Sequence, residues 1–318
     1  MDFDCASLAR ARLARDITLV ESTRADHQRE AQNLLSKILP QTGKSLRIGI
    51  TGVPGVGKST FIEAFGLHII SQGHKVAVLA IDPSSTKTGG SILGDKTRMA
   101  KLAQNDSAFI RPSPTSGSLG GVARRTREAM LLCEAAGYDV IIVETVGVGQ
   151  SETEVADMVD MFMLLLLPAS GDELQGIKKG IVELADVMIV NKADGDLVAQ
   201  AKRVQSDYAA ALRMLHPAIS HWNPAVKICS AITNQGIAEI WQVAMEFEIA
   251  MRKTGELEKK RSHQAVSWMW KEIKETLISN FINNPVIEKK LQSLEKDVEH
   301  GKKPATQAAM ELMSGSII

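Results

Sequence analysis

The stretch GVPGVGKST, residues 52–60, constrains the fold more than any other part of this chain. It matches the pattern G-x-x-x-x-G-K-[ST], follows the apolar run LRIGIT, and precedes a helical pattern that contains Phe61, Ile62 and Phe65. A strand, a glycine-rich turn and a helix in this order form a phosphate-binding loop, whose backbone N–H groups surround a phosphate at the start of the helix. The sequence therefore predicts a nucleoside triphosphate site on an α/β fold.

The residues of this loop have separate expected roles. Gly52, Gly55 and Gly57 let the backbone bend around the β-phosphate. Lys58 is expected to bridge the β- and γ-phosphates, and the Ser59 hydroxyl is expected to bind Mg²⁺. The predicted nucleotide-binding residues here are Gly52, Val53, Pro54, Gly55, Val56, Gly57, Lys58, Ser59 and Thr60.

Short apolar runs between Leu46 and about Phe247 predict a parallel sheet. The spacers between most of these runs are long enough for helices, which favours βαβ crossovers. We therefore expect a P-loop NTPase of the α/β class, with a mostly parallel sheet flanked by helices. The six candidate strands are LRIGIT (46–51), KVAVLAID (75–82), DVIIVET (139–145), MFMLLLLP (161–168), DVMIVNK (186–192) and AVKICSA (225–231).

Helical patterns lie on both sides of the sheet region. Residues 5–40 carry apolar side chains at helical spacing, and Pro40 and Gly43 end that pattern. We predict an N-terminal helical extension over 1–43, a P-loop domain over 44–250, and a C-terminal helical element over 251–318. In the last of these, one helical face carries Val266, Trp270, Ile273, Leu277 and Phe281, and Gly301 and Pro304 precede a short final helix, ATQAAMELM.

The stretch NKAD, residues 191–194, indicates which base is bound. Asp194 can accept hydrogen bonds from both the N1–H and the exocyclic amine of guanine, whereas adenine has an acceptor at N1 and no such amine. The alternative reading is a solvated turn after a strand. Because the motif follows the apolar run DVMIV and lies downstream of a phosphate loop, we expect GTP and GDP in preference to adenine nucleotides.

Four further residues are expected near the base. Asn191 is expected to contact the base edge or to brace the phosphate loop, and the stem of Lys192 to cover the purine face. A backbone N–H of Ser230 or Ala231 is expected to meet the guanine O6.

Three acids are candidates for the Mg²⁺ site beside Ser59. Asp82 and Glu144 end apolar runs, and Asp95 lies in the Ser-, Thr- and Gly-rich loop between them. Carboxylates at the carboxyl ends of parallel strands point into the ligand crevice, and they suit a hard cation. The alternative readings are a turn-forming Asp82 before a proline and a helix-capping Asp95.

The residues after Glu144 predict slow hydrolysis. Gly147 is available to donate its N–H to the γ-phosphate, but Val148 occupies the position where switch GTPases usually carry a water-orienting Gln. Nearby cations are Arg98, Arg124, Arg125, Lys178 and Lys179, most of which also fit solvated helix faces. We expect Lys178 to move into the site, so that the candidate catalytic residues are Lys58, Glu144 and Lys178.

Composition narrows the range of partners and compartments. The 37 basic and 37 acidic residues cancel, and aromatic residues make up only 4% of the chain, which argues against nucleic acid and anionic membranes as partners. The most apolar stretch, MFMLLLLPA, is shorter than the ~20 residues of a membrane helix. Cys5, Cys133 and Cys229 show no paired spacing. Cysteines without paired spacing read as the thiols of a reducing compartment, so we expect a cytoplasmic protein.

The chain resembles the MeaB-type GTPases, also known as ArgK or LAO/AO transport-system kinases, whose human relative is the methylmalonic aciduria type A protein. The resemblance extends over nearly the whole chain and rests on stretches beyond the general GTPase motifs. These stretches are GVPGVGKSTFIEAFG, DPSSTKTGGSILGDKTRM, RPSPTSGSLGGVARRTRE, YDVIIVETVGVGQSE, GDELQGIKKGI and NKADGD.

This resemblance implies a chaperone of adenosylcobalamin-dependent methylmalonyl-CoA mutase. Such proteins use GTP to gate cofactor loading and to protect or reactivate the mutase. The resemblance also implies that Ser59, Asp82, Asp95 and Glu144 lie around Mg²⁺, that SGDELQGIKKG with Lys178 is a mobile switch, and that the C-terminal helices form a homodimer.

Two other functions remain open at this point. A metal-insertion GTPase for nickel or cobalt would be expected to carry a His-rich tract or a Cys-x-x-Cys pair, and the seven histidines here are scattered. A kinase acting on a transport protein would need an acceptor site and would more naturally use ATP, which Asp194 argues against.

Overall fold

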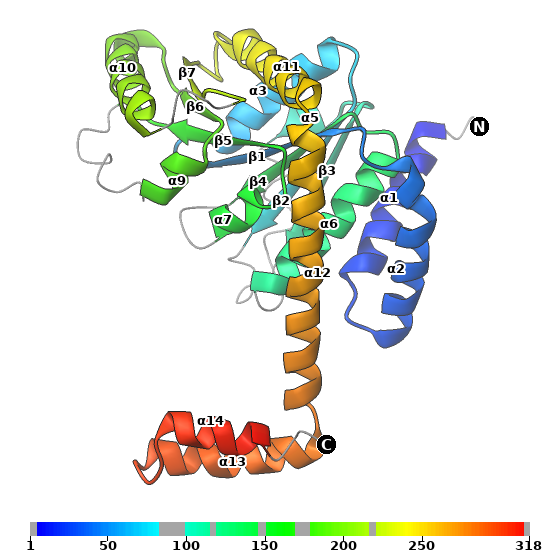
Figure 1. The fold of residues 1–318 in the computed structure, drawn as a ribbon. Coiled ribbons are helices and arrows are strands. Elements are labelled where there is room, and N and C mark those ends of the chain that lie inside the picture. The colour runs from blue at the N-terminus through cyan, green and yellow to red at the C-terminus, as the bar shows by residue number, and fades with distance from the viewer. Residues whose placement is uncertain are drawn as a thin grey trace. The chain divides into compact units, whose positions relative to one another are not determined.

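A computed structural model describes residues 5–82, 99–114, 119–145, 151–168, 179–215 and 221–314. The chain divides into two compact units, Met1–Gln264 and Ala265–Ile318. The first unit holds a twisted sheet with helices on both faces, and the second consists of helices in its described part (Figure 1). The helices before the sheet belong to the same compact unit as the sheet. The predicted division into three parts, with boundaries at residues 43 and 250, stays a proposal.

The described residues of the first unit form seven strands in one parallel sheet. The strand order is β3-β2-β4-β1-β5-β6-β7, and every recorded pairing is parallel. The central strands read as continuous apolar runs because helices cover both of their faces. The predicted fold class is confirmed. The strands are β1 (Leu46–Gly52), β2 (Val76–Asp82), β3 (Ala108–Pro114), β4 (Val140–Thr145), β5 (Met161–Leu166), β6 (Val187–Val190) and β7 (Ala225–Ile228).

Strand β3 was not among the six predicted strands. Its sequence, AFIRPSP, contains two prolines, which argue against a strand because proline has no N–H to donate. Its position in the sheet resolves the conflict: among the strands that the structure describes, β3 lies at the edge and pairs with β2 alone. An edge strand tolerates proline because one side of its backbone needs no ladder partner.

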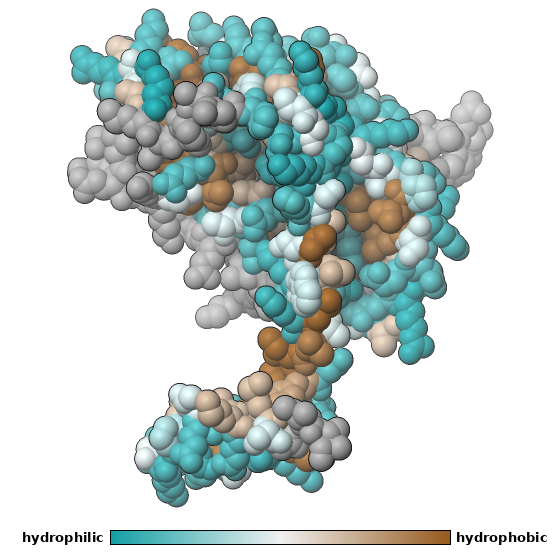
Figure 2. All heavy atoms as spheres, viewed as in Figure 1, coloured by the Kyte–Doolittle hydropathy of each residue, from teal (hydrophilic) through white to brown (hydrophobic). Residues whose placement is uncertain are grey.

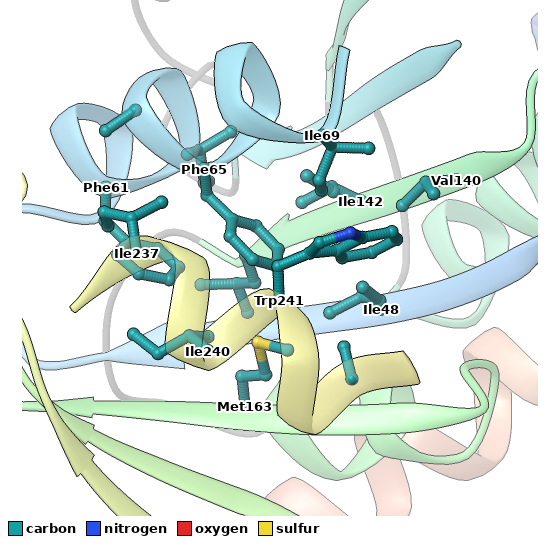
Figure 3. Packing of buried hydrophobic residues seen from close by; sticks show 14 of the residues in the cluster. Ile48, Phe61, Phe65, Ile69, Val140, Ile142, Met163, Ile237, Ile240 and Trp241 are labelled. Carbon is teal, nitrogen blue, oxygen red and sulfur yellow. The ribbon is translucent and has the colours of Figure 1, made fainter. Parts of the chain in front are cut away.

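Helices α3 and α11 pack together over one face of the sheet (Figure 1). Their bounds are Lys58–Ser71 and Ile237–Lys253. Figure 3 shows Phe65 between Phe61 and Trp241, with Ile48, Ile142 and Met163 of the sheet beneath. The rings of Phe61 and Phe65 stack at 5.3 Å between centroids, and Phe65 meets Trp241 edge-on at 6.1 Å. This packing fixes the helix that begins at Lys58.

Helices α6 (Leu119–Ala135) and α7 (Ser151–Ala156) pack against other elements of the sheet, α7 against β1 and β4. Gly49 of β1 lies directly beneath α7. A Cβ added to it would come within 2.9 Å of Val155 Cγ1 and within 3.0 Å of Val159 Cγ2. The lack of a side chain at Gly49 therefore lets α7 lie close to the strand that leads into the phosphate loop.

The predicted N-terminal helical segment is confirmed as two helices, α1 (Cys5–Glu21) and α2 (Ala25–Ile38). They pack against α6 and bury Leu13, Ile17 and Leu35. Glu21 forms an ion pair with Arg111 of the edge strand β3. Pro40 lies in the short 3₁₀ helix η1 (Leu39–Gln41) that ends the segment.

The remaining helices in the described residues of the first unit are short or lie beside β5 to β7. They are α5 (Ala100–Ala103), α9 (Lys179–Leu184), η4 (Gly195–Leu197) and α10 (Val198–Leu215). None of the helices in the described part of the chain combines the length and the apolar character needed to cross a membrane.

Helix α12 (Glu256–Ile282) begins in the first unit, where it is anchored to the segment before β5. Arg261 donates to both carboxylate oxygens of Asp160, from Nε at 2.7 Å and from Nη2 at 2.5 Å. Lys260 Nζ donates to the Asp160 carbonyl at 2.6 Å, and Gln264 Nε2 donates to the Val159 carbonyl at 2.9 Å. The start of α12 is therefore held by buried polar contacts.

The second unit has a small core of its own. Helices α13 (Pro285–Glu299) and α14 (Ala305–Ser314) bury Ile287, Leu294, Ala308 and Leu312 between them, with Phe281 packed against this cluster. The predicted final helix is confirmed. Upstream of Phe281, the residues predicted to share a face of α12 are exposed, and Figure 2 shows apolar side chains along this stretch. The exposed set is Val266, Trp270, Ile273 and Leu277.

Candidate nucleotide site

The phosphate loop connects the end of β1 at Gly52 with the start of α3 at Lys58. Gly55 and Gly57 adopt positive φ angles of 82° and 92°, which favour glycine. A Cβ added to Gly57 would lie 2.9 Å from Asn191 Nδ2, and one added to Gly52 would lie 2.7 Å from the Leu165 carbonyl oxygen. The glycines thus allow the loop to curve tightly against the neighbouring strands, as a phosphate loop requires.

Lys58 is the cation of this loop. Its Nζ donates to the carbonyls of Gly52 at 2.7 Å and Val53 at 3.3 Å, so the side chain lies along the loop. Burial lowers the pKa of Lys58 below its ordinary value, and the negative charges of Glu144 and Glu152 partly offset this effect. The loop thus holds an ammonium group in the place where phosphates are predicted to bind.

Ser59 and Glu144 come together as the sequence predicts. Glu144 lies at the carboxyl end of β4 next to β1, is 4% exposed, and accepts a hydrogen bond from Ser59 Oγ at 3.3 Å. A serine hydroxyl and a carboxylate are hard oxygen ligands, and they fit Mg²⁺. The backbone of Asp82 ends β2, the strand on the other side of β4, and so lies at the same edge of the sheet.

Several predicted residues cannot be placed in this way. The side chain of Asp82 lies outside the described residues, as do Asp95, Gly147, Val148 and Lys178 in full. Their predicted roles stay predictions.

Asn191 joins the phosphate loop to the predicted base-binding loops. Its Nδ2 donates to the Val56 carbonyl at 2.9 Å, and its Oδ1 accepts from the Ala231 N–H at 3.3 Å. Lys192, the next residue, has a positive φ of 59°. Asn191 was expected either to contact the base edge or to brace the phosphate loop. Its contacts in this structure are those of a residue that braces the loop.

Replacing Asn191 by Ala should weaken both the fold and nucleotide binding. The change leaves the buried Val56 carbonyl and Ala231 N–H without this partner, which costs about 1–3 kcal/mol for each buried group left unsatisfied. We expect a lower melting temperature and an affinity for GDP reduced about 10-fold, measured by thermal unfolding and by titration with a fluorescent GDP analogue. Asn223→Ala, at an exposed position, is the control. Equal behaviour of the two variants would contradict the bracing role.

Asp194 is held by Ser230. The buried Ser230 hydroxyl donates to Asp194 Oδ2 at 2.5 Å and accepts from the Thr233 N–H at 3.3 Å. The Ser230 N–H donates to the Gln235 carbonyl, and the Ala231 N–H donates to Asn191. The hydroxyl of Ser230 thus orients Asp194, the residue predicted to recognise the base. The sequence did not indicate this role for Ser230. The prediction that one of the two N–H groups meets guanine O6 stays a prediction.

Glu152 is a residue near the site that sequence reasoning missed. It lies in the first turn of α7, is 1% exposed, and is close enough to Lys58 for its charge to affect the lysine. An acid in the sequence GQSETE looks like an ordinary helix-start residue. The only available signal was that a helix start directly after the loop at Glu144 lies near the phosphates.

Comparison with known proteins shows the family of this chain. Residues 13–286 match a family model described as methylmalonyl Co-A mutase-associated GTPase MeaB. A putative GTPase of Caulobacter vibrioides is 55% identical over 305 residues, which cover 96% of this chain and 93% of the relative. The mitochondrial methylmalonic aciduria type A homolog of Mus musculus is 51% identical over 302 residues, covering 92% and 73%.

A solved structure is similar to this chain over nearly its whole length. The crystal structure of an LAO/AO transport system kinase is 39% identical, covers 99% of this chain and 98% of its own, and superposes with a TM-score of 0.76. The family match covers most of the chain, and the phosphate loop, Ser59 with Glu144, and Asp194 with Ser230 form one site at the carboxyl edge of the sheet. The chain therefore belongs to the MeaB family of methylmalonyl-CoA mutase-associated GTPases, enzymes that bind and hydrolyse GTP.

Proposed function

We propose that this GTPase gates the loading of adenosylcobalamin into an adenosylcobalamin-dependent methylmalonyl-CoA mutase and protects or reactivates that enzyme. The observation that carries the proposal is the family match over residues 13–286, whose description names the mutase. The relative from Mus musculus, named for methylmalonic aciduria, supports the same client. The output of GTP hydrolysis is then a conformational change rather than a product.

The site residues have distinct roles in this proposal. Lys58 binds the β- and γ-phosphates, Asp194 reads guanine, and Asn191 keeps the two loops in register. Mg²⁺ supplies the positive charge that offsets the phosphates. Ser59 and Glu144 would hold it, which their hydrogen bond to each other supports, together with Asp82 and Asp95.

Hydrolysis is proposed to be slow in the free protein. Val148 cannot orient a water molecule by hydrogen bonding, and Gly147 contributes only its N–H to the γ-phosphate. Lys178 is proposed to enter the site when the mutase binds. A cation supplied to a phosphoryl-transfer site in this way is worth about 10³–10⁵ in rate. The partner thereby controls when GTP is hydrolysed.

A cofactor-transfer assay tests the proposal. Mutase lacking its cofactor is mixed with adenosylcobalamin and this protein, and mutase activity is followed with GTP, with a non-hydrolysable GTP analogue, and without nucleotide. We expect loading to depend on which nucleotide is present, and we expect Lys58→Ala to abolish that dependence. Loading that is identical under all three conditions would overturn the proposal.

We also propose that the protein is a homodimer formed through α12, in the reducing environment of the cytoplasm. The exposed apolar face of α12 supports the first point, and the buried free thiols of Cys133 and Cys229 support the second. A face of this kind exposed on a helix marks an interaction site.

A charge on this face should separate the protomers. Leu277 is 63% exposed, so Leu277→Asp should leave the melting temperature of the fold nearly unchanged while shifting the sedimentation coefficient from that of a dimer to that of a monomer. Thr276→Asp introduces the same charge about 100° away around the helix and is the matched control. A wild-type protein that sediments as a monomer would contradict the dimer.

A further inference from the structure

Two buried threonines meet at the point where β1 and β4 leave their shared ladder. Thr145 Oγ1 donates a hydrogen bond to Thr51 Oγ1 at 2.8 Å, and the two residues are 0% and 1% exposed. The last recorded backbone pair between these strands is Ile50 with Glu144. One residue farther along each strand, the two hydroxyls therefore continue the connection between β1 and β4 through side chains.

Both threonines adjoin residues of the nucleotide site. Thr51 precedes Gly52, where the phosphate loop begins. Thr145 follows Glu144, which accepts a hydrogen bond from Ser59. Because side chains alternate between the two faces of a strand, Thr145 points to the face opposite that of Glu144. A bond that holds Thr145 also fixes the backbone at Glu144, and so fixes where the Glu144 carboxylate lies relative to the phosphate loop.

The chemistry of this pair indicates a role beyond filling space. A buried hydroxyl is costly unless it is hydrogen-bonded, and two valines would fill nearly the same volume without any polar atom. The residues of β4 before Glu144 are all apolar. Unlike apolar packing, a hydrogen bond is directional, so the Thr51–Thr145 pair sets the separation and angle of the two strands directly before the site.

We propose that Thr51 and Thr145 are positioning residues for GTP hydrolysis: their hydrogen bond holds Glu144 in the orientation in which it binds Mg²⁺ beside Ser59. The inference rests on the proposed Mg²⁺ site and adds to that site the pair that aligns its carboxylate. Neither threonine is proposed to touch the nucleotide or the metal, and both act through the residues next to them. Removing a residue that holds a metal ligand in place typically changes metal affinity by about 10–100-fold.

The Mg²⁺ dependence of hydrolysis tests this role. Single-turnover GTP hydrolysis by the full chain is measured over a range of Mg²⁺ concentrations, for the wild-type protein and for Thr145→Val. We expect the Mg²⁺ concentration that gives the half-maximal rate to rise about 10-fold in the variant. The affinity for a fluorescent GDP analogue in excess EDTA should change little, because that binding involves no Mg²⁺.

Further variants separate positioning from stability. Thr145→Val alone leaves the buried Thr51 hydroxyl without this partner and should lower the melting temperature. Adding Thr51→Val removes both hydroxyls, which can be nearly neutral for stability, so the melting temperature should recover while the shift in Mg²⁺ dependence remains. Thr145→Ser retains the hydroxyl and should keep the wild-type Mg²⁺ dependence. Val143→Ala, at a buried position on the same face of β4, should lower the melting temperature without that shift.

The results that contradict the inference are distinct from those that contradict the Mg²⁺ site. A Thr145→Val protein with the wild-type Mg²⁺ dependence would overturn the inference and assign the pair to packing. A double variant that recovers this dependence together with its stability, or a Val143→Ala protein with the same shift, would do so too. Glu144→Gln tests the Mg²⁺ site itself. If that variant also keeps the wild-type Mg²⁺ dependence, the proposed Mg²⁺ site fails, and the inference fails with it.

Discussion

Replacing Asp194 by Asn should exchange the base preference of this GTPase from guanine to xanthine. The Asp194 carboxylate, held by Ser230, offers two acceptors to the N1–H and exocyclic amine of guanine. Asn keeps one acceptor for N1–H but places an amide donor opposite the guanine amine. Xanthine has a carbonyl oxygen at that position, so it can accept from the new donor.

The expected effect is large. A hydrogen bond to a charged group contributes about 1.5–3 kcal/mol, so the loss of the contact to the guanine amine should weaken GDP binding by roughly 10–10²-fold. Competition titrations with GDP, xanthosine diphosphate and ADP measure the change. Asp196→Asn, at an exposed position in the same loop, is the matched control and should behave like the wild-type protein. An Asp194→Asn variant with an unchanged preference for guanine would show that Asp194 does not read the base.

Removing the side chain of Arg261 should destabilise the first unit more than removing that of a more exposed arginine. The side chain of Asp160 is 0% exposed and that of Arg261 is 14% exposed. Burial acts to lower the pKa of Arg261, but the hydrogen bond and charge of Asp160 outweigh it, so the pKa is raised and the guanidinium stays charged. Arg261 also donates to the carbonyls of Gly43 and Ser45, at 2.5 and 2.6 Å.

Arg261→Ala therefore leaves a buried carboxylate without its cation. Breaking a buried ion pair in this way costs about 3–5 kcal/mol, and at about 2–4 °C per kcal/mol the melting temperature should fall by roughly 6–20 °C. Arg252→Ala is the control, because Arg252 pairs with Glu248 at a site where its side chain is 35% exposed. Exposed pairs contribute only about 0–1 kcal/mol. Equal shifts for the two variants in calorimetry would contradict the anchoring role of Arg261.

The sequence predicted the parts of the fold that depend on local pattern. Six strands were found because a strand buried on both faces reads as an apolar run, and the phosphate loop was found because its glycines and Lys58 have fixed spacing. Strand β3 was missed because Pro112 and Pro114 are compatible with a strand only at an edge, and the position in the sheet is a property of the whole fold.

Several contacts could not be predicted because their residues lie far apart along the chain. Asp160 and Arg261 are 101 residues apart, and Arg47 pairs with Glu134 across 87 residues. No local pattern indicates that such residues meet. Glu152 was missed for the same reason, since its burial beside the phosphate loop depends on how α7 packs against Gly49.

We propose that a mutase controls GTP hydrolysis by this protein. The most direct measurement is steady-state GTP hydrolysis by the purified protein, with and without an adenosylcobalamin-dependent methylmalonyl-CoA mutase. We predict slow turnover alone and a rise of at least 10-fold when the mutase is added; a cation supplied to a phosphoryl-transfer site can produce a rise of up to about 10³–10⁵-fold. An unchanged rate, with no complex between the two proteins in sedimentation, would contradict the claim and make metal delivery the next function to test.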